Sequence, residues 1–277
     1  MVNKIEAISK KKHLNYSFLP LNKSSKNFSS FAKVSNCPIY LSEIKEIALY
    51  FPIFFTKDKN EEFSIKCLFS LINDHNVFIN KKGNFTALYL PVYFRCFPFV
   101  IATNEKTNEK LLCFRTNTEL LKKARDKKYI PFFDKNGQLS DTLKDIMQIL
   151  NILENEKDKT RNAINLLKEH GLIVEWPVTL KFTDGEKKLE GIYKIDENKI
   201  KELSKDILFD IYKNGALMLA YSQIISTDNI NKLGLHHLHR VQNNNKNKNL
   251  RDVTLEKQKE IKKKELDDLV QNLIDSD

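Results

Sequence analysis

Residues 53–71 have the sequence IFFTKDKNEEFSIKCLFSL, in which two apolar, aromatic-rich runs flank a charged segment. Short runs of aromatic and β-branched residues separated by polar turn clusters are typical of antiparallel strands. The pattern continues to Arg115, so the sequence predicts an antiparallel sheet in the N-terminal half of the chain. The predicted strands are Ile53 to Thr56, Phe63 to Leu71, Asn76 to Asn80, Phe97 to Ala102 and Leu111 to Arg115.

Helical patterns lie before and after this region. Several of the predicted strands are apolar on both faces, which favours helices that cover at least one face of the sheet. Ser42 is a plausible N-cap for a helix that Pro52 ends, with Glu43 and Glu46 in its first turn. The sequence therefore predicts an α+β fold, with a largely antiparallel sheet in the N-terminal half covered by helices, and a helical C-terminal region. The other predicted elements are a strand at Pro38 to Leu41, helices from Ser140 to Leu153 and from Lys159 to His170, a hairpin of Val178 to Phe182 with Leu189 to Lys194, and helices between Asn198 and Val241.

The length and composition favour one domain with appendages. We predict a basic, partly ordered N-terminal arm at residues 1–36, an α+β body at residues 37–241, and a tail at residues 242–277 with an Asn/Lys linker and a charged helix. The longest apolar stretches are broken by Pro52, Pro91, Arg95 and Pro98, so no membrane span is expected. The N-terminus lacks the features of a cleaved signal peptide, which places the protein in the cytoplasm. Export to the envelope or surface without such a signal stays open.

The net charge of +10 does not by itself indicate a nucleic-acid partner. Residues 1–40 contain seven lysines and one glutamate, so most of the excess falls in the predicted arm. A heavy use of Lys, Asn, Ile and Phe throughout the chain also raises the isoelectric point without selecting a partner. The sequence therefore makes nucleic-acid binding unlikely.

The sequence offers no strong catalytic or metal-binding motif. Glycine-rich phosphate loops and the G-x-S-x-G elbow are absent, and the four cysteines form no C-x-x-C pair, which favours buried, reduced thiols. His236 and His239 share one face of a predicted helix, but two ligands do not make a metal site. We therefore predict no metal and no cofactor, and the catalytic residues of any enzymatic activity stay unknown.

The segment from Tyr89 to Phe99 has the most unusual local composition, because a single arginine lies among aromatic residues and two prolines. Arg95 could bind a carboxylate or a phosphate, with Tyr89 and Tyr93 as neighbouring contact residues. Alternatively, Arg95 could be structural, with its stem packed on an aromatic ring and its head bonded to loop carbonyls. The sequence leaves both alternatives open.

This segment belongs to a series of short motifs through which the chain resembles the SapC family, a family named after a protein associated with bacterial S-layer genes. The resemblance covers about residues 38–233. Two departures are Phe85, where the family usually has tryptophan, and Phe114-Arg115, where it has an acidic residue. The residues that support it are Pro38 to Glu43, Ala48 to Phe54, Asn76 to Ile79, Gly83, Tyr89, Pro91, Arg95, Pro98-Phe99, Phe133-Asp134, Gly137, Leu143, Gly191 to Asp196, Gly215 to Leu217, Ala220-Tyr221 and Ser226.

The resemblance implies a link to S-layer biology or cell-surface assembly, and it transfers no catalytic residue. We favour an accessory or binding protein with a protein partner, acting in the cytoplasm or at the envelope, over an enzyme. An enzyme or a small-molecule-binding protein with its site near Tyr89 and Arg95 is the alternative. A structural component of the surface layer is a third interpretation.

Overall fold

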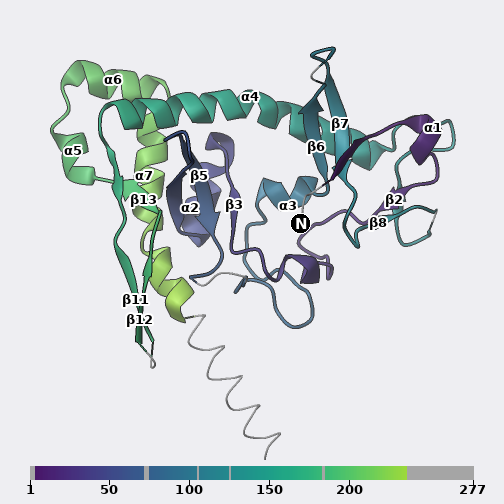
Figure 1. The fold of residues 1–277 in the computed structure, drawn as a ribbon, viewed down its shortest axis with the longest axis horizontal. Helices are drawn as coiled ribbons and strands as arrows, with labels where there is room; N and C mark the ends of the chain where they lie inside the picture. The colour runs from purple at the N-terminus through teal and green to yellow at the C-terminus, as the bar shows by residue number, and fades with distance from the viewer. Residues whose placement is uncertain (1–3, 72–74, 105, 125, 183–184, 236–277) are drawn as a thin grey trace, which may run out of the picture. The chain divides into compact units, whose positions relative to one another are not determined.

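The computed structural model describes residues 4–71, 75–104, 106–124, 126–182 and 185–235 (Figure 1). Residues 1–233 form one compact unit. The tail predicted at residues 242–277, with its charged helix, and the pair His236 and His239 lie outside the described residues. In the described part of the chain, every helix is too short or too polar to cross a membrane.

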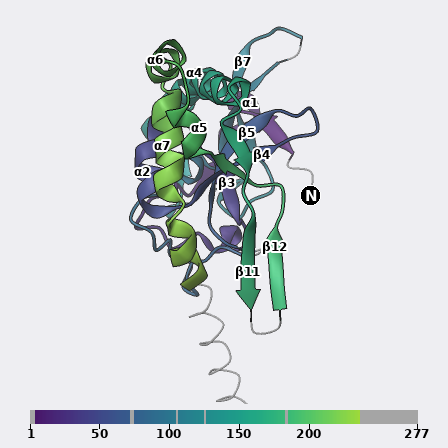
Figure 2. The same ribbon diagram turned by 90° about the vertical axis from the view of Figure 1, so that its left-hand side faces the viewer.

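A five-stranded antiparallel sheet with the order β10-β13-β4-β5-β3 forms the larger half of the unit. Its central hairpin confirms the strands predicted around residues 53–71. Helix α7 (Ala216–Ser226) packs on β4 and β13, and helix α2 (Ile44–Tyr50) packs on α7 (Figure 2). The strands are β3 (Asn36–Pro38), β4 (Ile53–Lys57), β5 (Phe63–Leu68), β10 (Ile173–Glu175) and β13 (Tyr193–Ile195).

Buried polar side chains of α7 tie the helix to the sheet. The side-chain oxygen of Gln223 accepts a hydrogen bond from the Ile195 amide at 2.8 Å, and its amide group donates to the Ile53 carbonyl at 3.1 Å. Ser226 Oγ accepts from the Ile53 amide at 2.9 Å. These contacts satisfy backbone groups of β4 and β13 that would otherwise be buried without partners.

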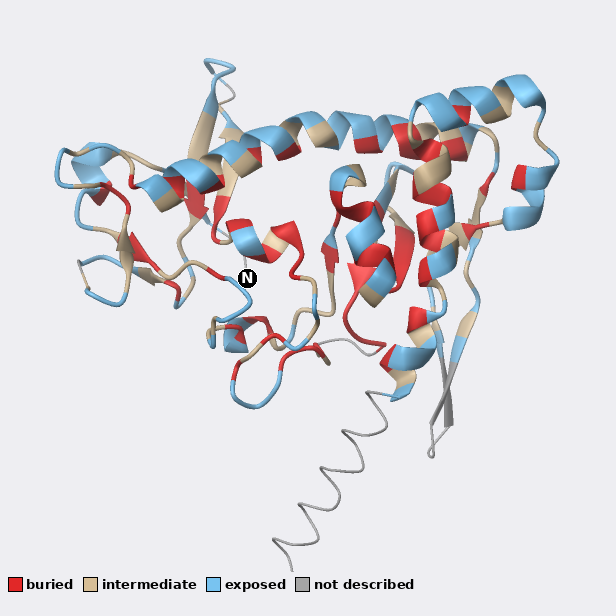
Figure 3. Cartoon of the chain, turned by 180° about the vertical axis from the view of Figure 1, so that it is seen from behind, coloured by how far each residue is buried: buried red, intermediate tan, exposed pale blue. Residues whose placement is uncertain are grey.

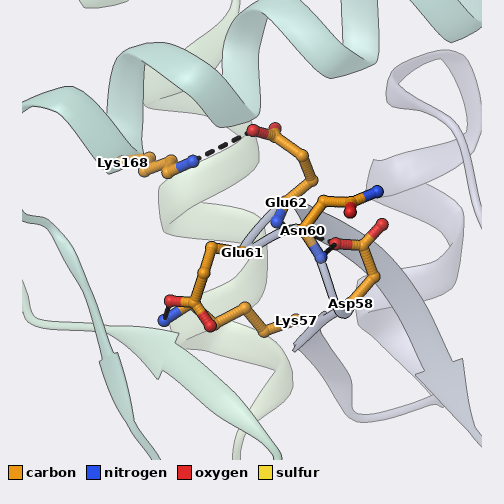
Figure 4. Close-up of polar contacts among 6 residues, drawn as sticks. All are labelled: Lys57, Asp58, Asn60, Glu61, Glu62 and Lys168. Atoms are coloured by element: carbon orange, nitrogen blue, oxygen red, sulfur yellow. Dashed lines mark hydrogen bonds and ion pairs between the residues drawn. The ribbon is translucent and has the colours of Figure 1, made fainter.

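The turn between β4 and β5 is fixed by its own side chains and by the neighbouring helix. Asp58 Oδ1 accepts from the Asn60 amide at 2.8 Å, and Lys57 pairs with Glu61, which has a left-handed φ of 62° (Figure 4). Glu62 Oε1 lies 3.2 Å from Lys168 Nζ near the end of helix α4 (Asp141–Glu169). The hairpin is therefore held at both its strands and its tip.

The apolar residues packed around this sheet form what we call the first core. Phenylalanine rings dominate it, because Phe28, Phe31, Phe69 and Phe85 all lie within ring contact of Phe94. Such edge-on and tilted ring pairs add to the stabilisation that comes from burying apolar area.

Two three-stranded sheets, with orders β1-β7-β6 and β8-β2-β9, form the smaller half. They enclose the second core, which includes the fully buried rings of Phe18, Phe114 and Phe132. The segment predicted as an arm, residues 1–36, contains β1, β2, helix α1 (Lys10–His13), the short helix η1 (Ser29–Phe31) and the first residue of β3. The strands are β1 (Ile5–Ala7), β2 (Ser17–Phe18), β6 (Phe99–Thr103), β7 (Lys110–Arg115), β8 (Leu121–Lys122) and β9 (Ile130–Pro131).

Helix α4 joins the two halves. Buried residues recur along the length of this helix (Figure 3). Leu143, Ile146 and Leu150 pack in the second core, whereas Ile164 and Leu167 pack in the first core. The prediction of two separate helices here was wrong. The intervening residues 154–158 are polar but include no glycine or proline, and ion pairs such as Glu154 with Lys157 support the helix across them.

Other predicted boundaries also need correction. Residues 76–80 form a turn instead of a strand, because Asn76 Oδ1 accepts from the Phe78 amide at 3.0 Å. In the predicted hairpin, β11 (Val178–Phe182) is correct, but its partner β12 is Gly185–Leu189, and residues 193–195 join the large sheet. The predicted helical region contains α5 (Glu197–Lys201), α6 (Lys205–Lys213), α7 and a helical stretch at 229–235.

The α+β fold class is confirmed, with 38% helix and 22% strand. The boundaries at residues 36 and 241 of the three predicted segments stay predictions.

Candidate functional site

The segment from Tyr89 to Phe99, which has the unusual composition, forms a short helix, α3 (Val92–Cys96), between Pro91 and Pro98. Phe94 is fully buried in the first core, whereas Val92 and Cys96 are buried in the second core. Helix α4 also contacts α3 (Figure 1). The segment therefore lies where the two cores meet, and the strand predicted from Phe97 begins only at Phe99.

A buried carboxylate holds the first turn of α3. Glu43 ends the short helix η2 (Leu41–Glu43) and is only 4% exposed. Its Oε2 accepts a hydrogen bond from the Val92 amide at 3.0 Å and another from the Tyr89 hydroxyl at 3.0 Å. The Val92 amide has no partner within its own helix, so the carboxylate acts as an external cap.

The environment of Glu43 is unusual for a carboxylate. Burial raises its pKa, while the hydrogen bonds from Val92 and Tyr89 and the charge of Arg95 oppose that rise. Its second oxygen, Oε1, is buried and has no hydrogen-bond partner among the described residues. The prediction that Ser42 caps a helix with Glu43 in its first turn was wrong, because Ser42 and Glu43 lie in η2 and α2 begins at Ile44.

Arg95 is exposed on the last turn of α3 and lies over Tyr89. Its guanidinium carbon is 6.0 Å from the centre of the Tyr89 ring, and its Nη2 donates a weak hydrogen bond to the Tyr89 hydroxyl at 3.5 Å. Burial and the nearby Glu43 raise the pKa of Tyr89, so its hydroxyl stays protonated and remains a donor to Glu43. Tyr89 thus contacts both the buried Glu43 and the exposed Arg95, and it connects the protein interior with the surface.

The third predicted residue, Tyr93, lies in a different environment. It is half-buried against the first core, 5.4 Å from the Phe94 ring, and burial raises its pKa with a further contribution from Cys37. Residues two apart on a helix do not share a face. The structure therefore brings together Tyr89 and Arg95, with Glu43 as a partner that the sequence did not single out.

The thiols and the phenol near this group are poorly suited to nucleophilic chemistry. Burial raises the pKa of Cys96 to about 11, and burial with the nearby Glu154 raises the pKa of Tyr40 to about 12. All four cysteines are buried, as predicted, and Cys37 faces Cys67 across β3 and β5 with the sulfur atoms 3.5 Å apart. A thiol with a raised pKa, such as that of Cys96, is a weak nucleophile because it stays protonated.

The described residues include no cluster of three or more side chains that could hold a metal ion. A hollow of about 510 Å³ lies at the base of β11 and β12 and is lined by Trp176 and Tyr193 among others. A second hollow of about 350 Å³ includes Tyr16 and Lys123. Neither of these two hollows is lined by Tyr89 or Arg95, and Arg95 is exposed. A guanidinium held this way can form paired hydrogen bonds with a carboxylate or a phosphate.

Comparison with known proteins identifies one family. The model of the family described as SapC matches residues 8–233, so the match includes most of the segment predicted as an arm. No curated protein and no solved structure gives a significant match.

Proposed function

The chain belongs to the SapC family, and from this premise we propose that it is a non-catalytic binding protein that uses Arg95 and Tyr89 to contact an acidic group of a protein partner. We further propose that it serves as an accessory factor in surface-layer or cell-surface assembly. The second proposal rests on the family's association with S-layer genes. It is compatible with action in the cytoplasm or at the envelope.

The observation that supports the binding proposal is the way in which Arg95 is held. Glu43 fixes Tyr89 and the start of α3, and Phe94 anchors the same helix among four phenylalanine rings. The adjacent Arg95 nevertheless stays exposed. A preorganised side chain loses less conformational freedom on binding than a free one, so rigid support of an exposed arginine favours recognition.

A surface contact fits protein binding better than enclosed chemistry. Leu88, next to Tyr89, is 68% exposed and adds apolar area beside the cation. Arginine and tyrosine are enriched among residues that contribute most to protein interfaces. The carboxylate of Glu43 is covered by protein and acts here as a positioning group.

The experiment compares partner cross-linking in cells by the full-length chain and by its Arg95→Ala variant, with Arg161→Ala as the matched control. Arg161 is an exposed arginine on α4 that pairs with Asp158. A photo-reactive residue introduced at position 88 would cross-link the partner in cells. We expect a cross-linked partner that Arg161→Ala retains and Arg95→Ala loses. Equal cross-linking by both folded variants would refute the proposed contact.

A second candidate function follows from the unpartnered Oε1 of Glu43. A buried carboxyl group with a raised pKa is a common feature of general acids and of ligand sites. A small-molecule ligand that reaches this oxygen would make the group near Tyr89 and Arg95 an enzymatic or ligand-binding site. Ligand-observed NMR with carboxylate and phosphate fragments would test this, because a hit must be lost in Glu43→Gln. If no fragment binds in a way that Glu43→Gln abolishes, the ligand-binding function is refuted and the contact with a protein partner is the remaining proposal.

A further inference from the structure

Eight exposed lysines from three separate segments gather at the end of the unit formed by the β8-β2-β9 sheet. We call this surface the basic face. Three of the lysines come from α1, four from β8 and the loop that follows it, and one from the turn after β9. They are Lys10, Lys11, Lys12, Lys122, Lys123, Lys127, Lys128 and Lys135.

Strand pairing and side-chain contacts place these segments next to one another. Strand β2 pairs with β8 on one side and with β9 on the other, so that Ser17 faces both Lys122 and Pro131. Ser17 Oγ also donates to the Ala124 carbonyl at 2.7 Å. The side chain of Lys10 lies against Gly137, because a Cβ atom added to Gly137 would clash with Lys10 Nζ. In Figure 1, α1, β2 and β8 occupy the same end of the fold.

The helix that presents three of the lysines is fixed from beneath. His13 is buried, accepts a hydrogen bond from the Ser9 amide at 3.0 Å, and contacts the Phe114 ring at 5.1 Å. Its other ring nitrogen is 3.3 Å from Glu6. The lysines of α1 are therefore part of a folded surface instead of a free arm.

Acidic residues do not balance this surface. Within the same segments, Asp126 pairs with Lys122 at 2.5 Å, and Asp134 accepts two backbone hydrogen bonds in its own turn. By contrast, residues 197–213 around α5 and α6 contain four lysines and four acidic residues. The basic face therefore has an excess of positive charge that the surface around α5 and α6 lacks.

The chemistry of the basic face suits a diffuse anionic surface. Its described cations include eight lysines, which are point charges on flexible stems and need no fixed partner geometry. Tyr129 is half-buried and already lies under Lys122, at 4.7 Å. Leu14, directly after α1, is 41% exposed. Lysines that flank an exposed aliphatic residue fit the headgroup region of an anionic bilayer.

We propose that the basic face binds peripherally to membranes that contain anionic phospholipids. Each lysine near such a surface contributes a favourable and roughly additive attraction that salt screens within about 10 Å at 0.1 M ionic strength. This function is separate from the contact proposed for Arg95 and does not depend on it.

The test is co-sedimentation of the full-length protein with vesicles of phosphatidylglycerol and phosphatidylcholine, compared with vesicles of phosphatidylcholine alone. The variant replaces Lys11, Lys12, Lys123 and Lys127 with alanine. A control variant removes the same number of charges from Lys45, Lys59, Lys205 and Lys213, which are exposed on other elements.

We expect the protein and the control variant to bind only the anionic vesicles, and the basic-face variant to bind at least about tenfold more weakly. Binding should fall sharply as salt rises, and Arg95→Ala should bind vesicles as the unmodified protein does. Equal weakening in both lysine variants would overturn the proposal, because general charge would then explain binding. Absence of vesicle binding, together with binding to single-stranded DNA that only the basic-face variant loses, would overturn it in favour of nucleic acid.

Discussion

The two cores of this protein are assembled in different ways. The first core packs on one five-stranded sheet, whose centre is the hairpin of β4 and β5. The second core lies between two three-stranded sheets, one with a comparable hairpin of β6 and β7 and the other built from the two-residue strands β2, β8 and β9. Local patterns therefore specify one hairpin in each half, whereas the β8-β2-β9 sheet forms only when distant segments meet.

Two helices connect these unequal halves. Helix α4 extends through both cores, and α3 places Phe94 in one and Val92 in the other. The candidate contact residues Glu43, Tyr89 and Arg95 lie at this junction. The geometry of this candidate site depends on both cores. Substitutions in either core therefore test which core holds it in place.

The largest expected effect is the loss of Phe132, a fully buried ring of the second core. Phe132→Ala should lower the free energy of unfolding by about 3–5 kcal/mol, because it removes a large apolar side chain and leaves a cavity. Hydrogen exchange should show faster opening of β6 and β7 with β4 and β5 less affected. A uniform increase over all strands would contradict the separation of the two cores.

A smaller effect is expected from a break in α4 between the cores. Lys157 is an exposed residue whose Nζ pairs with Glu154 at 2.5 Å. Lys157→Pro should cost about 3 kcal/mol, since proline removes a helix hydrogen bond and clashes with the preceding turn. Urea denaturation monitored by circular dichroism measures this, with Lys157→Ala as the control, which should lose less than about 0.5 kcal/mol. A proline variant as stable as the alanine variant would show that α4 does not couple the halves.

The smallest expected effect concerns the charge of Glu43 at the junction. Because burial raises the pKa of Glu43 in the folded protein, the folded state holds its proton more tightly than the unfolded state. The stability of the unmodified protein relative to Glu43→Gln should therefore be greatest below the unfolded pKa and should decline as pH rises through the folded pKa.

Thermal unfolding of both proteins from about pH 4 to about pH 8 measures this trend. Glu169→Gln, which changes an exposed carboxylate of α4, controls for the loss of one charge. A relative stability that increases with pH would mean that hydrogen bonds outweigh burial at Glu43.

The sequence predicted those parts of the fold that local patterns determine. Strands β4, β5 and β7 follow from runs of apolar residues, and the α+β class follows from their arrangement with helical segments. The strand predicted at 76–80 failed because the Asn76 side chain stabilises a turn that competes with extended structure. Helix α3 was missed because its β-branched and aromatic residues favour strands, and a distant carboxylate caps it.

The candidate site was only partly predictable. Tyr89 and Arg95 were selected from an unusual composition, and the structure shows them in contact. Glu43 could not be selected, because its burial results from contacts with residues 46 and 49 positions away. That Tyr89, Tyr93 and Arg95 bind a ligand or partner stays a prediction.

The central claim is that Arg95 is kept for contact with a partner and not for the fold. Equilibrium unfolding of Arg95→Ala tests it most directly, with the adjacent Phe94→Ala as the comparison. Phe94→Ala should lose about 3–5 kcal/mol because its ring fills the first core. Arg95→Ala should change stability by no more than about 0.5 kcal/mol, as expected for an exposed side chain. A loss of more than about 2 kcal/mol for Arg95→Ala would contradict the claim and assign this arginine to the structure.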